Sequence, residues 1–123
     1  MFVEQIPGSR LGVQVTRSGP VLVCVAVSGE LVSDTAGVLA EQVRATLVRQ
    51  QPDTMLLNLA QLEFIDVAGV HTLYELHTAA ATRDCTLIIR NASRPTRWIL
   101  SALGLDALFP SPARRRPRAE PGS

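Results

Sequence analysis

Four short apolar stretches, separated by longer amphipathic ones, set the predicted order of strands and helices. In residues 11–16, Val13 and Val15 alternate with polar neighbours, which is typical of a half-exposed strand. Residues 21–27 are a continuous, mostly β-branched run, which predicts a strand buried on both faces. A Ser-Gly-Pro turn lies between the two. We therefore expect an antiparallel hairpin.

Two further strands are predicted by dense apolar runs. Residues 55–59 form the first and residues 86–90 the second. Ser28 and Gly29 are expected to end the strand before them, and residues 60–65 are interpreted as a connecting stretch with at most a short extended piece.

Helical periodicity fills the intervals between these strands. Ser33 or Asp34 is expected to cap a helix that runs to about residue 50, with an apolar stripe at Leu39, Val43 and Leu47. Asp66 is expected to open a second helix that runs to about residue 83. Its stripe is formed by Val70, Leu73, Leu76 and Ala80.

A third helix is predicted after Ser93, which is a favourable cap with Pro95 close behind it. Gly104 and Leu105 match the glycine and the apolar residue of a Schellman-type helix end. The expected apolar side is Trp98, Ile99, Leu100 and Leu103, and Phe109 is expected to pack as a final anchor.

The resulting order is β-β-α-β-α-β-α. Crossover helices between strands indicate an α/β fold, with a mixed, mostly parallel sheet of four to five strands and helices mainly on one side. With 123 residues the chain has room for one core, which we place in residues 1–110. Residues 111–123 are rich in Pro, Arg, Ala, Gly and Ser, which is typical of a disordered tail.

Composition narrows the function classes. The formal net charge is +1, so a strongly basic nucleic-acid binder is not the default interpretation. All twelve basic residues are Arg, which leaves no lysine for a Schiff base or a P-loop. Residues 111–123 carry four Arg against one Glu. This tail could contact nucleic acid, anionic lipid or an acidic partner, or it could be a solvated terminus.

Targeting signals are not evident in the sequence. The apolar run at residues 21–27 is far shorter than a membrane span, and the N-terminus lacks the basic and apolar regions of a signal peptide. Cys24 and Cys85 both lie in aliphatic runs, so we expect buried free thiols. A cytoplasmic location without membrane insertion fits these features.

The most informative stretch is the start of the second predicted helix. Asp66 is an acidic cap, and Val67, Ala68 and Gly69 make the first turn small. Unpaired backbone N–H groups favour an anion or another acceptor at such a helix start, and small residues allow a second surface to approach closely. Capping alone is an equally good interpretation of Asp66.

Four stretches, in this order and spacing, resemble the STAS domain family of anti-sigma-factor antagonists and related modules. They are residues 27–31, residues 56–59 followed by Phe-Ile-Asp and Gly69, residues 87–91, and the helix end at residues 103–109. The resemblance implies binding to a serine-kinase anti-sigma factor of the GHKL ATPase type. It also implies inactivation by phosphorylation of a hydroxyl directly after the aspartate that Asp66 matches.

The sequence departs from the family at that point, because Val67 and Ala68 occupy the hydroxyl positions. The nearest hydroxyl on this helix is Thr72. The family often has an aspartate where this chain has Val32, and Asp34 follows two residues later. We therefore expect a docking surface without the serine phospho-switch. Its expected residues are Gly29, Glu30, Leu31, Asp66, Val67, Ala68, Gly69, Val70 and His71, with Val67, Ala68 and Val70 as an apolar rim.

Catalysis is not expected. His71 and Glu75 are i, i+4 neighbours, which is typical of a surface pair, and His77 is expected at the edge of the core. No phosphate loop, metal-spaced Cys pair or nucleophile elbow is evident, so no cofactor or metal is expected. The alternatives are a STAS subunit of a scaffold, transporter or ATPase assembly, or a small nucleotide-binding module. A homodimer is possible in each case.

Overall fold

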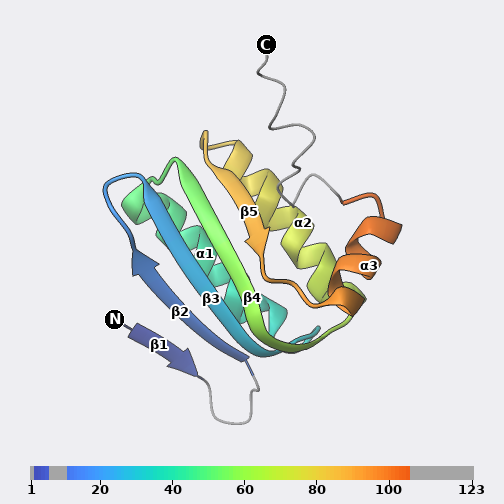
Figure 1. Ribbon diagram of the computed structural model, residues 1–123. Coiled ribbons are helices and arrows are strands. Elements are labelled where there is room, and N and C mark those ends of the chain that lie inside the picture. Colours follow the sequence, from blue (N-terminus) through green and yellow to red (C-terminus); the bar gives the residue numbers. More distant parts are fainter. Residues whose placement is uncertain (1, 6–10, 106–123) are drawn as a thin grey trace.

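The computed structural model of the protein describes residues 2–5 and 11–105 (Figure 1). Its elements follow in the order β1 (Phe2–Gln5), β2 (Leu11–Arg17), β3 (Leu22–Leu31), α1 (Ala36–Gln50), β4 (Thr54–Ile65), α2 (Val67–Ala81), β5 (Thr86–Arg90) and α3 (Arg94–Ala102).

One sheet runs through the molecule in the order β1-β2-β3-β4-β5. β1 pairs antiparallel with β2, and β2 pairs antiparallel with β3. β3 with β4 and β4 with β5 are parallel, joined by the crossover helices α1 and α2. The predicted α/β class and mixed sheet are confirmed. The sheet is less parallel than expected, because β1 adds a second antiparallel pairing that the sequence pattern did not reveal.

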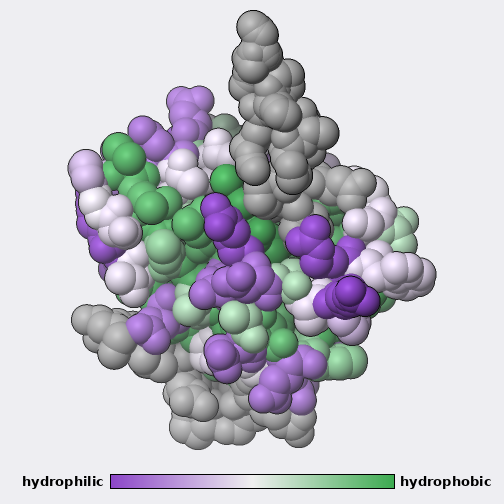
Figure 2. Space-filling model, in the orientation of Figure 1, coloured by the Kyte–Doolittle hydropathy of each residue, from purple (hydrophilic) through white to green (hydrophobic). Residues whose placement is uncertain are grey.

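The helices α1 and α2 cover one face of the sheet, which lies in front of them in Figure 1. Strand residues that point to this side are buried with the helix stripes and form the core, for example Val25, Leu57, Ile89, Leu39 and Leu73. The alternate strand positions face the viewer in Figure 2, where apolar and polar side chains are mixed. The core therefore lies between the sheet and its one layer of helices, as expected.

Two strands are longer than the sequence predicted. β3 continues through Ser28 and Gly29 to Leu31, and β4 continues through the expected connecting stretch to Ile65. The pairing between them shifts register on both sides of Ser28–Gly29, and Gly29 has φ of 88°. The predicted strand break is therefore a bulge, since glycine adopts positive φ without steric cost and lets the ladder resume.

Two of the three predicted helix N-caps are confirmed, and the third is corrected. Asp66 caps α2 and Ser93 caps α3, as expected. Neither Ser33 nor Asp34 caps α1, because its N-cap is Thr35. At the end of α3 the Leu105 N–H donates to Leu100 O and the Gly104 N–H to Ser101 O, which confirms the Schellman motif.

The apolar side of α3 is narrower than predicted. Leu100 is fully buried and Ile99 half-buried, but Trp98 is 73% exposed and Leu103 56% exposed. A helix at the edge of the molecule touches the core along one line of residues, so the neighbouring apolar positions stay in solvent. The expected anchor Phe109 and tail 111–123 lie outside the described residues.

Candidate functional site

The candidate site lies where two parallel strands end side by side. Glu30 pairs with Phe64 and Leu31 with Ile65, so β3 and β4 end at the same edge of the sheet. The loop before α1 and the start of α2 both leave from this edge (Figure 1). The sequence segments around Gly29 and Asp66, which were expected to lie alongside each other, are therefore brought together.

Asp66 holds these two segments in place. Its Oδ1 accepts the Gly69 N–H at 2.9 Å, which is the predicted helix cap. Its Oδ2 accepts the Ser33 N–H at 3.3 Å from the neighbouring loop. The Asp66 N–H in turn donates to Leu31 O at 3.2 Å. Both carboxylate oxygens are thus engaged with backbone, so the capping role of Asp66 is established and extends to a link between the two loops.

Gly69 allows α2 to approach the end of β3. A Cβ at this position would collide with Leu31 O and lie 2.8 Å from Ile65 Cγ1. Real Cβ atoms do not come so close to a backbone oxygen, so any larger residue must push the helix outward. Gly69 therefore serves close packing inside the molecule, whereas the sequence pattern suggested that it makes room for an external partner.

The predicted surface residues separate into three groups by exposure. Val67 is 77% exposed and His71 is exposed, while Gly29, Glu30, Asp66 and Ala68 are half-buried. Leu31, Gly69 and Val70 are buried. The expected apolar rim is thus corrected for Val70, which is only 2% exposed because it faces the sheet with the rest of the α2 stripe.

A shallow apolar groove runs from this helix start to the end of α3. It is lined by Val67, Val70, His71, Tyr74, Leu103 and Leu105. Val67, Tyr74 and Leu103 are all about half exposed or more. The groove was not predicted, since it forms between two helices whose relative placement the sequence pattern does not specify.

The two positions directly after Asp66, where a hydroxyl was sought in the sequence, provide none. Val67 and Ala68 carry none, and Thr72 is half-buried on α2. The exposed Ser33, whose N–H is bonded to Asp66, is the hydroxyl residue that the fold places beside the helix start. Residues 29–33 were expected alongside the helix start, but the Ser33 hydroxyl was not singled out, because 33 residues separate it from Asp66 in the sequence.

The two histidines of α2 are exposed or half-buried. His71 Nδ1 lies 3.6 Å from Glu75 Oε2, with side chains 72% and 53% exposed, so the expected surface pair is confirmed. His77 is half-buried, at the edge of the core. Among residues 2–5 and 11–105, no group of three or more His, Cys, Asp or Glu side chains is arranged to hold a metal ion.

The two cysteines are free but differ in burial. Cys85 is buried, as predicted, whereas Cys24 is only half-buried on the uncovered face of the sheet. Burial raises the pKa of the Cys85 thiol, and the negative charge of Asp53 raises it further. A thiol held in its neutral form is a poor nucleophile, so Cys85 is a structural residue.

The described helices include none that is both long and apolar enough to cross a membrane. No curated relative matches the chain in sequence.

Solved structures share the fold. An anti-sigma factor antagonist from Mycobacterium paratuberculosis is 24% identical with a TM-score of 0.70, covering 87% of this chain and 88% of that one. The Bacillus cell fate determinant SpoIIAA in its phosphorylated form is 17% identical with a TM-score of 0.65, covering 88% of this chain and 99% of that one. The murine solute carrier 26 family member A9 anion transporter is 14% identical with a TM-score of 0.65, covering 85% of this chain and 18% of that one.

The described architecture, a mixed sheet covered on one face by crossover helices, is therefore shared with antagonists and with a domain of a transporter. A family model for the STAS domain matches residues 13–117, which is most of the chain. The protein belongs to the STAS domain family.

Proposed function

We propose that the protein is a regulatory binding module of the anti-sigma-factor-antagonist type. Its partner is an anti-sigma factor of the serine-kinase, GHKL ATPase type. Binding takes place through the start of α2 together with the end of β3, and it does not depend on a serine phospho-switch in α2. The protein acts by binding and carries out no reaction of its own.

The exposed Val67 carries this proposal. Its side chain is 77% exposed at the position where the family has a hydroxyl, and it continues into the groove with Tyr74 and Leu103. Apolar side chains that project from a rigid helix start are the kind of residue that loses water favourably at a protein interface. Asp66 makes the site rigid through its bonds to Gly69 and Ser33, which lowers the entropy lost on docking.

Affinity purification from the native cell would identify the partner, and calorimetry would then test the surface. Val67→Arg should weaken binding at least about tenfold, because it places a charge where apolar area is buried. Val48→Arg is the matched control, since Val48 is also exposed, at 53%, but lies on α1. The surface assignment fails if both variants bind the partner equally well. The function fails if the partner recovered is not a kinase-type anti-sigma factor.

Phosphorylation provides the second test. The protein is incubated with ATP and the partner kinase, and its peptides are examined by mass spectrometry. No phosphate is expected on residues 64–74, and Ala68→Ser should restore a phosphate acceptor at the helix start. Ser33→Ala separates phosphorylation of the neighbouring loop from phosphorylation of α2. Stoichiometric phosphate on Thr72 would contradict the absence of a switch in α2.

A second candidate is a STAS subunit of a transporter or ATPase assembly. The similarity to a transporter of the solute carrier 26 family supports it, although this chain spans only 18% of that protein. Recovery of a membrane transporter or membrane ATPase in the purification, in place of a cytosolic kinase, would favour this function.

A further inference from the structure

Basic residues gather in the C-terminal third of the chain. Residues 86–123 carry seven Arg against two acidic residues, whereas residues 1–85 carry five Arg against nine acidic residues. In the described part of this region, residues 86–105, there are three Arg and no acidic residue. A partner that binds residues 86–105 should therefore be anionic.

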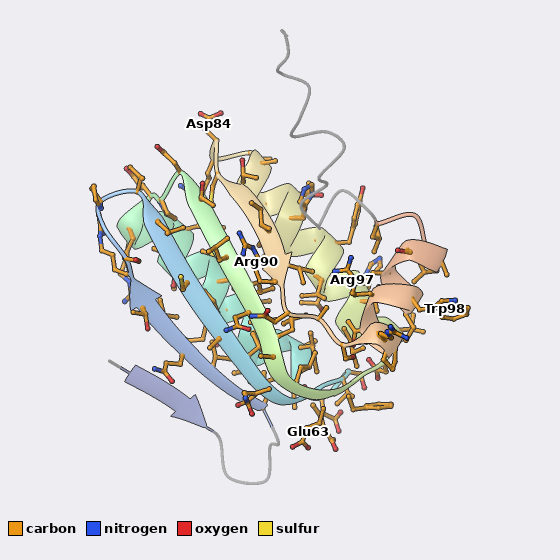
Figure 3. All side chains as sticks on the ribbon, viewed as in Figure 1. Glu63, Asp84, Arg90, Arg97 and Trp98 are labelled. Carbon is orange, nitrogen blue, oxygen red and sulfur yellow. The ribbon has the colours of Figure 1, made fainter. Side chains whose placement is uncertain are left out.

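The two sides of α3 differ in composition. Thr96 and Leu100 are buried and Ile99 is half-buried, so these residues hold the helix against the body. Arg94, Arg97 and Trp98 are exposed. Arg94 and Trp98 are one helical turn apart and share the outward face. The outward face of α3 is defined by Arg94 and Trp98 and combines positive charge with one large aromatic ring. Arg97 follows Arg94 by three positions and flanks this face, on the other side of α3 from Trp98 (Figure 3).

Trp98 is the single tryptophan of the chain and is 73% exposed. In Figure 3 its ring projects from α3 away from the rest of the molecule. A tryptophan in this position contributes little to the core. Its amphipathic ring is best placed at a boundary between an apolar and a polar phase, with one part dehydrated and its N–H in contact with water or headgroups.

We propose that the outward face of α3 binds peripherally to an anionic lipid bilayer. The bilayer supplies phosphate for Arg94 and Arg97 and, directly beneath the phosphates, an apolar layer for the ring of Trp98. Double-stranded nucleic acid offers phosphate without an accessible apolar layer, and an acidic protein would need a dedicated pocket for a projecting ring. A flat membrane needs no such pocket.

This interaction goes beyond the proposed function, because it uses other residues than the start of α2. It requires no spanning segment. It would place the protein at a membrane surface while Val67 and its groove remain available to a protein partner.

The single tryptophan provides the test. The full chain is mixed with vesicles of phosphatidylcholine and phosphatidylglycerol, and separately with vesicles of phosphatidylcholine alone. We expect Trp98 emission to shift to shorter wavelength and the protein to co-sediment only with the anionic vesicles. Added salt should reverse both effects, since screening weakens attraction to the surface.

Two sets of variants locate the contact. Arg94→Gln with Arg97→Gln should reduce vesicle affinity about 25-fold, at about fivefold for each Arg. Trp98→Ala should reduce co-sedimentation as well. Arg44→Gln with Arg49→Gln removes the same charge from exposed positions on α1 and should leave affinity nearly unchanged.

Several results would overturn the proposal. One is the absence of co-sedimentation with anionic vesicles. Another is equal loss of affinity in the α3 and α1 double variants, which would indicate a response to net charge alone. A third is a shift of Trp98 emission with duplex DNA or polyglutamate but not with vesicles, which would assign the surface to nucleic acid or to an acidic protein.

Discussion

The helices α1 and α2 start at the same edge of the sheet, after adjacent parallel strands, but their starts are held differently. At α2, the side chain of Asp66 caps the Gly69 N–H. At α1, Thr35 makes no side-chain cap and its hydroxyl turns back toward β3. There it donates to Glu30 O at 2.8 Å and accepts the Val32 N–H at 2.9 Å.

The glycine in the first turn also differs between the two helices in how closely it is packed. Gly69 in the first turn of α2 is packed against Leu31 and Ile65, whereas a Cβ on Gly37 in the first turn of α1 would meet nothing within 4 Å. The start of α2 is therefore fixed by close packing of Gly69 against the strand ends. The start of α1 is fixed by the hydrogen bonds of the buried Thr35. A rigid helix start is the better platform for docking, which is consistent with the surface proposed at Val67.

Gly69→Ala should have the largest effect on stability. The added Cβ collides with Leu31 O and Ile65, so we expect a loss of about 3 kcal/mol in the free energy of unfolding. Gly37→Ala is the matched control and should stabilise the protein by up to about 1 kcal/mol, because alanine favours the helix. Urea unfolding measures both. Equal changes in the free energy of unfolding for the two variants would show that the starts of α1 and α2 do not differ in packing.

Thr35→Val should have the next largest effect. It leaves Glu30 O and the Val32 N–H without their hydroxyl partner in a buried place, at a cost of about 2 kcal/mol. Thr35→Ser keeps the hydroxyl and should retain most of this stability. Thr82→Val removes an exposed hydroxyl bond to Ala79 O and should cost less than about 0.5 kcal/mol. Thermal unfolding of the three variants would decide whether α1 depends on its buried hydroxyl.

Asp66→Ala should have a smaller effect, about 1.5 kcal/mol, because it removes the cap and the bond to Ser33 while the packing of Gly69 remains. Asp66→Asn keeps an acceptor oxygen for Gly69 and should lose less. Asp34→Ala removes an exposed carboxylate from the neighbouring loop and is expected to be nearly neutral. A loss at Asp34 equal to that at Asp66 would show that charge, and not capping, is what matters at this edge.

Local patterns predicted the features that depend on neighbours in the sequence. The stripes of α1 and α2 are buried as expected, and Asp66, Ser93 and Gly104 mark helix ends as expected. Side-chain periodicity and capping act over one or two helical turns, so the sequence contains the information they need. The STAS resemblance rested on several such stretches in order, and the family match over residues 13–117 agrees with it.

The incorrect predictions concern features that depend on contacts between distant segments. Ser28 and Gly29 looked like a strand end, but pairing with β4 carries β3 past them through a bulge. Trp98 and Leu103 fit an apolar helix side, yet at the edge of the molecule no described residue buries them. Val70 fitted a docking rim and proved to be core.

The sequence by itself determined the order of the elements from β2 onward, the interior faces of the two crossover helices and the absence of a hydroxyl at Val67 and Ala68. These follow from residue type and from spacing along one helix or strand. Only the tertiary structure decided that Gly69 is needed against Leu31, that Ser33 lies beside Asp66, and that Val67 opens into a groove with Leu103. Each of these contacts joins residues more than 30 positions apart, whose approach depends on how the sheet brings its strand ends together.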